Sequence, residues 1–262
     1  MSQLHETARI LVEAAASGVA CDPIRETIGE SNIDAAYKIQ DLVAQKRLEG
    51  GDTIVGRKIG LTSPAVQKQL GVDQPDYGSL FNTMEVMEGG IIPWEETMQP
   101  KVEAEIAFIL GKDLTGGHIS IAQVIGAIDY VVPCIEIVGS RIKDWNIRIA
   151  DTIADNASAS HFVIGHQVKR LHQVDVVTSE MTLTKNGEKV SEGKGADCLG
   201  SPVNATWWLA KTMSSLGSPL RAGQLILAGA LGPMAAVKPG DHFEARFSGL
   251  GTVHVGFGNS KG

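Results

Sequence analysis

Two glutamates, Glu103 and Glu105, interrupt the apolar stretch Val102–Leu110 at alternate positions. Alternate side chains of a β-strand face the same side, so these carboxylates would share one face, with their Cα atoms roughly 6.5–7 Å apart. Carboxylates this close repel each other and resist burial. A divalent cation with oxygen ligands, Mg²⁺ or Mn²⁺, would offset both effects. The alternative is a half-exposed strand whose polar face lies in water.

A third carboxylate, Glu136, stands inside a second apolar stretch, Val131–Val138. A glutamate in such a stretch is unusual, because a buried charge needs a partner. If the two stretches form neighbouring strands, Glu136 completes a site of three carboxylates for one divalent metal. Pairing of Glu136 with a basic residue such as Arg141 is the alternative.

A lysine in the short stretch Val55–Thr62 is the next candidate. Arg57 and Lys58 are adjacent there, so in a strand they point to opposite faces, and one of them faces inward or toward a cleft. A lysine beside a metal-bound oxyanion can bind a carboxylate or move a proton, which would give Lys58 a catalytic role. An edge lysine whose ammonium reaches solvent explains the pattern equally well.

Asp76 lies in the segment Gln74–Gly78, whose Pro, Asp and Gly residues predict a turn. It could serve there as a general base, or its carboxylate could only accept hydrogen bonds from the turn backbone. The sequence has no Walker loop, and its seven histidines show no metal-ligand spacing. The acidic residues and Lys58 are therefore the best candidates for chemistry.

These residues need a scaffold, and the pattern of the chain predicts a helical N-terminus followed by a mostly β core. Helices are expected over residues 4–16 and from near Ser31 to Gly50. After Gly51, short apolar runs punctuated by Gly, Pro and Asn are typical of strands. The expected strands and hairpins cover residues 53–59, 102–110, 131–138, 181–191, 225–231 and 243–257, and two further helices cover residues 121–130 and 204–216.

The composition is that of an ordinary globular protein. The chain has 262 residues, of which 43% are hydrophobic and 20% charged, so a disordered chain is excluded. A net charge of −7 without a basic stripe argues against nucleic-acid and anionic-membrane partners. Because no apolar run is long enough to span a bilayer, no signal-peptide pattern is present and the three cysteines are widely spaced, we expect a cytoplasmic protein.

Seven motifs, in this order and spacing, resemble those of the 2-keto-4-pentenoate hydratase family within the fumarylacetoacetate hydrolase superfamily. They extend over nearly the whole chain and are Gly56–Ser63, Leu70–Gly78, Glu103–Glu105, Pro133–Glu136, Asp155–Ser158, Leu199–Asn204 and Gly229–Met234. The resemblance implies an α+β protein with a β roll or sandwich core, residues 76–262, and a small helical N-terminal region, residues 1–75. Hydrolases of the superfamily more often use Asp as the third acidic ligand and carry a His–Glu dyad. Neither feature is found here, which argues against C–C bond hydrolysis.

The resemblance also implies roles for particular residues. The ligands of Mg²⁺ or Mn²⁺ would be Glu103, Glu105 and Glu136. The catalytic residues would be Lys58 and Asp76, and the residues that bind substrate or water would be Asn156 and Ser158. The implied reaction adds water to 2-hydroxypenta-2,4-dienoate and gives 4-hydroxy-2-oxopentanoate, in the meta-cleavage degradation of aromatic compounds.

Two other functions stay open. A decarboxylase for 2-oxohex-3-enedioate (4-oxalocrotonate) would share the metal site but would need a pocket for a second carboxylate, for which Arg57, Arg141 and Arg148 are the candidates. A non-catalytic partner of such a decarboxylase is the other, since hydratases of this family associate with that enzyme. A scaffold would not need the complete set of acidic residues and Lys58. Members of the family form homo-oligomers such as pentamers and decamers, so we expect a homo-oligomer.

Overall fold

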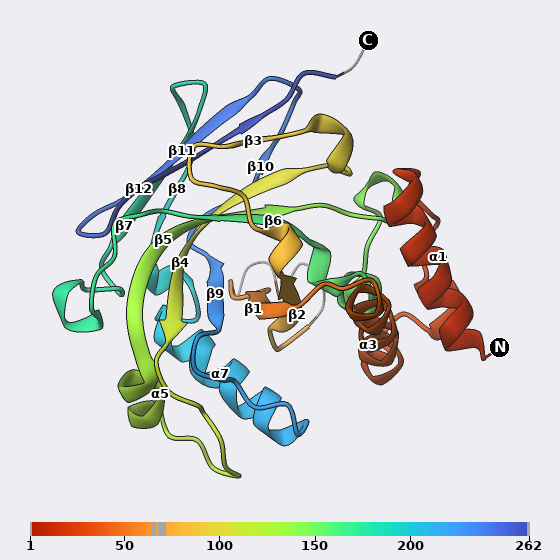
Figure 1. Cartoon of the computed structure of the whole chain (residues 1–262), viewed down its shortest axis with the longest axis horizontal. Helices are drawn as coiled ribbons and strands as arrows, with labels where there is room; N and C mark the ends of the chain where they lie inside the picture. The colour runs from red at the N-terminus through yellow and green to blue at the C-terminus, as the bar shows by residue number, and fades with distance from the viewer. Residues whose placement is uncertain (1, 64–66, 68–71, 261–262) are drawn as a thin grey trace.

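The computed structural model describes residues 2–63, 67 and 72–260. Leu70 and Gly71 of the second motif lie outside the described residues. Within the described ranges, the chain folds into a group of N-terminal helices beside two β-sheets (Figure 1). A search of these ranges finds no helix with the length and apolar character needed to cross a membrane.

The N-terminal helices are α1 (Gln3–Ser17), α2 (Arg25–Ile28) and α3 (Ile33–Glu49). Asn32 caps α3, because its side chain accepts a hydrogen bond from the Ala35 amide. α3 packs against α1 on one side and against α6 (Ile149–Ala154) on another. This packing fixes the position of α6 and of the turn that follows it.

The larger sheet has the strand order β2–β1–β9–β4–β5–β6, with β10 added beside β4. Its strands are β1 (Ile54–Gly60), β2 (Asp76–Phe81), β4 (Lys101–Leu110), β5 (Ile128–Val138), β6 (Ala159–Ile164), β9 (Leu225–Ala230) and β10 (Ala235–Ala236). β4 and β5 pair antiparallel along their length, so the two apolar stretches that carry the glutamates are neighbouring strands. β1 pairs antiparallel with β2 and parallel with β9.

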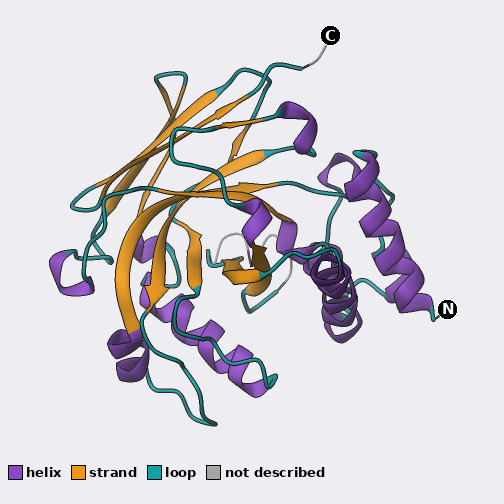
Figure 2. Cartoon of the chain, in the orientation of Figure 1, coloured by secondary structure: helices purple, strands orange, loops and turns teal. Residues whose placement is uncertain are grey.

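The smaller sheet has the order β3–β12–β11–β7–β8 and packs against the larger one (Figure 2). Its strands are β3 (Ile91–Ile92), β7 (Glu180–Lys185), β8 (Glu188–Lys194), β11 (His242–Phe247) and β12 (Gly251–Phe257). The hairpin predicted around Asn186-Gly187 joins β7 to β8. Val253 and Val255 of β12 belong to the same core as Ile135 of β5, so the two sheets share one apolar interior.

Two further α-helices and several short 3₁₀ helices complete the described fold. α5 (Ile121–Ala127) packs on α7 (Pro202–Ser215), and α7 also contacts β9. The predicted helix over residues 121–130 is too long, because residues from Ile128 onward pair with β4. The 3₁₀ helices are η1 (Asn82–Met84), η2 (Trp94–Glu96), η3 (Lys143–Trp145), η4 (Asn156–Ser158), η5 (Leu171–Gln173) and η6 (Gly195–Asp197).

The predicted α+β class, with a β-rich core and helices at the N-terminus, is confirmed. Strand β1 lies inside the region predicted as residues 1–75, yet it pairs with β2 and β9 in the larger sheet. The division of the chain at residue 75 stays a prediction.

Candidate active site

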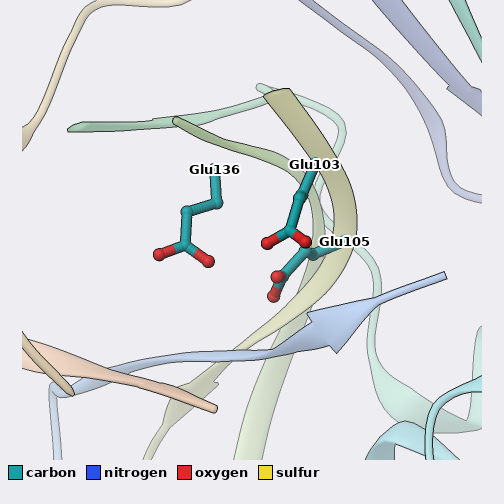
Figure 3. Close-up of side chains that lie close together, drawn as sticks. All are labelled: Glu103, Glu105 and Glu136. Atoms are coloured by element: carbon teal, nitrogen blue, oxygen red, sulfur yellow. The ribbon is translucent and has the colours of Figure 1, made fainter. Parts of the chain in front are cut away.

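The three glutamates come together where β4 and β5 pair. Glu103 and Glu105 lie on one face of β4, and Glu136 of β5 is the direct cross-strand partner of Glu103. Each offers one carboxylate oxygen, and these oxygens lie within 4.8 Å of one another. Figure 3 shows the three side chains pointing into one space. Like charges this close repel each other unless a cation lies between them.

Burial removes water from this cluster. Glu105 and Glu136 have 0% exposure. Glu105 Oε2 accepts a hydrogen bond from the Gly229 amide at 2.7 Å, but Glu105 Oε1 and both carboxylate oxygens of Glu136 have no hydrogen-bond partner among the described residues. Leaving a buried polar atom without a partner costs about 1–3 kcal/mol, and more for a charged group. Three carboxylates, two of which have buried oxygens without hydrogen bonds, fit a divalent cation that prefers oxygen ligands.

The pKa values of the three glutamates follow from this burial. Burial raises the pKa of Glu105 well above its ordinary range, and the charges of Glu136 and Glu103 raise it further. Burial raises the pKa of Glu136 to about 7, although the charge of Lys58 opposes the rise. Burial also raises the pKa of Glu103. A cation that binds here therefore competes with protons for the same oxygens.

Lys58 extends from β1 into the cluster and is only 3% exposed, so the alternative of an edge lysine that reaches solvent is wrong. Its ammonium donates to the Ala157 carbonyl oxygen at 2.9 Å and lies 3.3 Å from Glu136 Oε1, in an ion pair. Burial alone lowers the pKa of Lys58, but the nearby carboxylates, Glu136 first, raise it above its ordinary value. The lysine is therefore a fixed positive charge inside the site.

The alternative partner considered for Glu136 is also wrong. Arg141 pairs instead with the carboxylate of Asp155, and its guanidinium donates to the carbonyl oxygens of Asp155 and Ala159. This ion pair fixes the end of α6 next to the turn that follows. Glu136 is left with Lys58 as its cationic neighbour among the described residues.

Asp76 begins strand β2, so the predicted turn at this position is wrong. The strand forms because Asp76 pairs with Gly60 and Tyr77 pairs with Ile59 across the antiparallel ladder. Asp76 Oδ1 is buried without a hydrogen-bond partner among the described residues, and burial raises the pKa of Asp76 to about 6 despite the charge of Lys58. Gly60 leaves room for this carboxylate, since a Cβ there would lie 2.2 Å from Asp76 Oδ1.

A left-handed turn packs against β2 and β1 beside the site. Asn156, Ala157 and Ser158 have φ angles of 54°, 50° and 59°, a conformation that costs non-glycine residues energy. The side-chain amide of Asn156 donates to the Ser79 carbonyl oxygen and accepts from the Ser79 backbone N–H, so it fastens the turn to β2. Its predicted contact with substrate stays a prediction. The hydroxyls of Ser158 and Thr152 lie 3.2 Å apart, within hydrogen-bonding distance.

A cavity of about 1070 Å³ adjoins the site, and Lys58, Asp76, Glu103 and Ser158 are among its lining residues. Glu105 and Glu136 are fully buried and are not among them. Much of the remaining lining is apolar, from the end of β5 and the loops after β5 and β9, and includes Val138, Trp145, Ile147, Leu231, Pro233 and Met234. Lys101 also lines it, which the sequence analysis missed. Its alternate spacing with Glu103 and Glu105 would have revealed it. Trp145 gives no such signal, because it ends the short 3₁₀ helix η3 and belongs to no strand with alternating side chains.

Comparison with known protein families identifies the family of this chain. The family described as Fumarylacetoacetate (FAA) hydrolase C-terminal matches residues 62–257. The chain belongs to the fumarylacetoacetate hydrolase family. The matched range includes all three glutamates, Asp76 and the turn at residues 156–158.

Individual relatives of this fumarylacetoacetate hydrolase family member are similar to it over nearly its whole length. It is 52% identical over 254 residues to the TodF product hydratase of Pseudomonas putida, covering 97% of this chain and 95% of that protein. It is 52% identical over 255 residues to a 2-keto-4-pentenoate hydratase of Paraburkholderia xenovorans, with the same coverage. A solved structure, 4-oxalocrotonate decarboxylase from Pseudomonas putida G7 complexed with magnesium and adipate, superposes with a TM-score of 0.94 at 33% identity over 97% of both chains. The predicted resemblance to the 2-keto-4-pentenoate hydratase family is confirmed.

Proposed function

We propose that this chain is a metal-dependent hydratase that adds water to 2-hydroxypenta-2,4-dienoate (2-keto-4-pentenoate) and gives 4-hydroxy-2-oxopentanoate. This reaction is a step in the meta-cleavage degradation of aromatic compounds. The observation that carries the proposal is the cluster of three carboxylates beside Lys58, in which Glu105 and Glu136 have oxygens without hydrogen bonds and Glu103 and Lys58 line one cavity. The reaction class follows from relatives at 52% identity that are named as hydratases.

Glu103, Glu105 and Glu136 would hold the divalent metal of the proposed hydratase. We propose Mg²⁺ or Mn²⁺, because carboxylate and water oxygens suit these cations, and the similar decarboxylase structure contains magnesium. When bound, the cation supplies Lewis acidity toward the carboxylate and 2-oxygen of a chelating substrate.

Lys58 would stabilise the negative charge that develops on the 2-oxygen of the substrate. Protonation of the dienol at C5 gives a 2-oxo-3-enoate, and addition of water at C4 then returns electron density toward that oxygen. The Ala157 carbonyl and Glu136 hold the ammonium in place, so it needs no reorganisation when charge develops. A preorganised charge in a site shielded from bulk water stabilises such a state more than a mobile charge does.

Asp76 is the best candidate for orienting the attacking water or taking its proton. Its unpartnered Oδ1 and its pKa of about 6 suit a base that works near neutral pH. Protonation at C3 would then release 4-hydroxy-2-oxopentanoate. Ser158, which lines the cavity, would bind substrate or water through its hydroxyl. We propose the same for Asn156, on the family resemblance alone.

The decarboxylase alternative needs a cation for a second carboxylate. The three arginines considered for that task, Arg57, Arg141 and Arg148, are not among the lining residues of the cavity. Arg57 donates to the Ser79 hydroxyl at 2.9 Å, and Arg141 is engaged by Asp155. None of these three arginines is therefore placed to bind a second carboxylate, and Lys101, which lines the cavity, is the remaining cation of the described lining for that task.

We also propose a homo-oligomer, pentamer or decamer, a possible complex with a 4-oxalocrotonate decarboxylase, and a cytoplasmic location. These proposals rest on the family resemblance and on the sequence features given above. Light scattering of the purified protein would test the homo-oligomer, and co-purification with a decarboxylase would test the complex.

The test of the proposed activity follows the ultraviolet absorbance of 2-hydroxypenta-2,4-dienoate with purified protein, with Mg²⁺, with Mn²⁺ and with a chelator. We expect rapid, metal-dependent loss of absorbance and 4-hydroxy-2-oxopentanoate as the product. Metal binding without turnover would contradict the hydratase. Release of CO₂ from 2-oxohex-3-enedioate would instead support the decarboxylase.

A further inference from the structure

Lys101 occupies the outer end of the strand face that carries the metal-site candidates. Lys101, Glu103 and Glu105 alternate along β4, so all three side chains share one face. Across the ladder, Lys101 pairs with Val138 and Glu103 pairs with Glu136, which puts the lysine one pair further along the face. Lys101 and Val138 both line the cavity. The ammonium therefore belongs to a wall of the cavity, next to the carboxylates.

Trp145 holds this ammonium in place. Lys101 Nζ lies 4.0 Å from the centre of the Trp145 ring, a cation–π contact. The indole is itself fixed, because its Nε1 donates to the Gln99 carbonyl oxygen at 2.9 Å. The Gln99 amide donates in turn to the carbonyl oxygens of Ser140 and Ile142.

The backbone around Trp145 is strained at several points. Gln99, Asp144 and Trp145 have φ angles of 50°, 58° and 53°, which are left-handed values for non-glycine residues. Strain of this kind destabilises the backbone locally and gathers at ligand clamps and active sites. The strained loop presents the Trp145 ring to Lys101 on the cavity wall.

The net charge of the site suggests a function for Lys101. Glu103, Glu105, Glu136 and Asp76 are four carboxylates, and Lys58 with a divalent cation leaves one net negative charge. A 2-oxo acid substrate is itself an anion, so this charge would repel it. Glu192 and Asp197 also line the cavity and add further acidic groups. Within the described lining, Lys101 is the one cation besides Lys58.

We propose that Lys101 is an anion-recognition residue of this site and that Trp145 is its positioning residue. Lys101 would attract the carboxylate of the substrate and offset the one net negative charge that the four carboxylates leave. The proposal rests on the proposed function, because it takes the substrate to be an anionic 2-oxo acid or its dienol. Charges that line a cleft with low-dielectric walls raise the local concentration and association rate of an oppositely charged ligand.

The first test is the salt dependence of Lys101→Met. At low ionic strength we expect kcat/KM to fall about fivefold, which corresponds to the loss of one charge within roughly 10 Å of the substrate. The difference should shrink to within about twofold in 0.5 M salt, where screening is strong. Lys101→Arg should keep the salt dependence of the wild type. Lys143→Met removes the same charge from an exposed residue outside the cavity lining and should leave kcat/KM unchanged.

Trp145→Leu tests the positioning role. If Trp145 acts through Lys101, the variant should lose part of the salt dependence, and it should have no further effect on kcat/KM when Lys101 is already methionine. A pair that only fastens the loop to β4 would lower the melting temperature and leave the salt dependence of both variants like that of the wild type. That result would overturn the proposal.

The closing experiment measures the binding of 2-oxopentanoate, a saturated 2-oxo acid, to the Mg²⁺-loaded protein by calorimetry. We expect Lys101→Met to weaken binding about fivefold at low salt and Lys143→Met to leave it unchanged. Equal affinity in wild type and Lys101→Met would overturn the proposal. Because no turnover is needed, a protein that binds 2-oxopentanoate through Lys101 but does not hydrate the dienoate would contradict the proposed function alone.

Discussion

Two acidic clusters in this molecule place similar side chains in opposite circumstances. On β11, β12 and the loop before β3, His254 lies between Glu88 and Glu244, with its ring nitrogens 2.8 Å and 3.0 Å from their carboxylate oxygens. Glu244 also pairs with Arg246. The His254 side chain is 45% exposed, so water reaches the cluster. Each carboxylate there has a hydrogen-bonding partner within the protein, and Glu244 also has the cation of Arg246.

The cluster of Glu103, Glu105 and Glu136 lacks that balance. Lys58 forms its one ion pair among the described residues, and three carboxylate oxygens have no hydrogen bond. The comparison teaches that a group of acidic residues is not by itself a sign of a ligand. Buried oxygens without partners are such a sign, because the protein leaves their desolvation uncompensated.

Removing one carboxylate from each cluster tests the difference between them most directly. Glu136→Ala should lose metal affinity and at least about 10³-fold in activity, because the Lewis acid is no longer held, while the fold is kept. Glu244→Ala should change activity less than about twofold. Activity assays, metal titration and circular dichroism measure the three properties. Normal hydration by Glu136→Ala, or by Glu136→Gln if the alanine variant does not fold, would show that the three-carboxylate site is wrong.

Lys58→Met separates chemistry from metal binding within the buried cluster. We expect kcat to fall about 10²-fold, because a preorganised positive charge next to the reacting oxygen is lost. Metal affinity should fall far less, since removing a cation from the cluster does not remove a ligand. Turnover assays and metal titration of the same preparation provide the check. Equal losses of turnover and metal affinity would indicate a structural lysine.

Metal binding should also stabilise the fold through the buried cluster alone. A cation at a hundred times its Kd stabilises the folded state by about 2.7 kcal/mol. In a chain of this size, this would raise Tm by roughly 5–10 °C. Calorimetric scans with Mg²⁺ and with a chelator test this expectation. The rise should disappear in Glu136→Ala and persist in Glu244→Ala, and a rise that persists in both would locate the metal elsewhere.

The smallest predicted effect is the pH dependence of the stability that His254 contributes in the exposed cluster. The hydrogen bonds to Glu88 and then Glu244 raise the pKa of His254 above its ordinary value. Its contribution to stability is therefore fully present below an unfolded-state pKa of about 6.5 and is lost as the pH rises through the higher folded-state pKa. His254→Gln should cost less than about 1 kcal/mol at pH 6, because the group is partly exposed. Urea unfolding in saturating Mg²⁺ should show this cost vanishing near pH 9, and a cost that grows with pH would contradict the assignment.

The three glutamates could be found from the sequence because each contradicts its surroundings. A charged residue in an apolar stretch is visible without a structure, and the period of two along a strand assigns Glu103 and Glu105 to one face. Pairing of the two stretches was an assumption, which the ladder between β4 and β5 confirms. Their role as metal ligands stays a prediction.

Other features of the site depend on contacts that local patterns do not contain. The Pro-Asp-Tyr-Gly composition around Asp76 predicts a turn, but pairing with β1 makes this segment a strand. The helix expected over residues 121–130 ends early for the same reason, since Ile128 pairs with Leu110. The role of Trp145 could not be predicted, because its left-handed backbone conformation occurs without a glycine or asparagine at that position.

The alternation along β4 also has a consequence for folding. One face of β4 carries Lys101, Glu103 and Glu105, and the other face carries Val102, Ala104 and Ile106. A slip of one residue against β5 would turn the whole set over, so that three charged groups enter the apolar core. Such a misaligned chain is strongly disfavoured. The side chains proposed to recognise metal and substrate therefore also specify the register in which these two strands assemble.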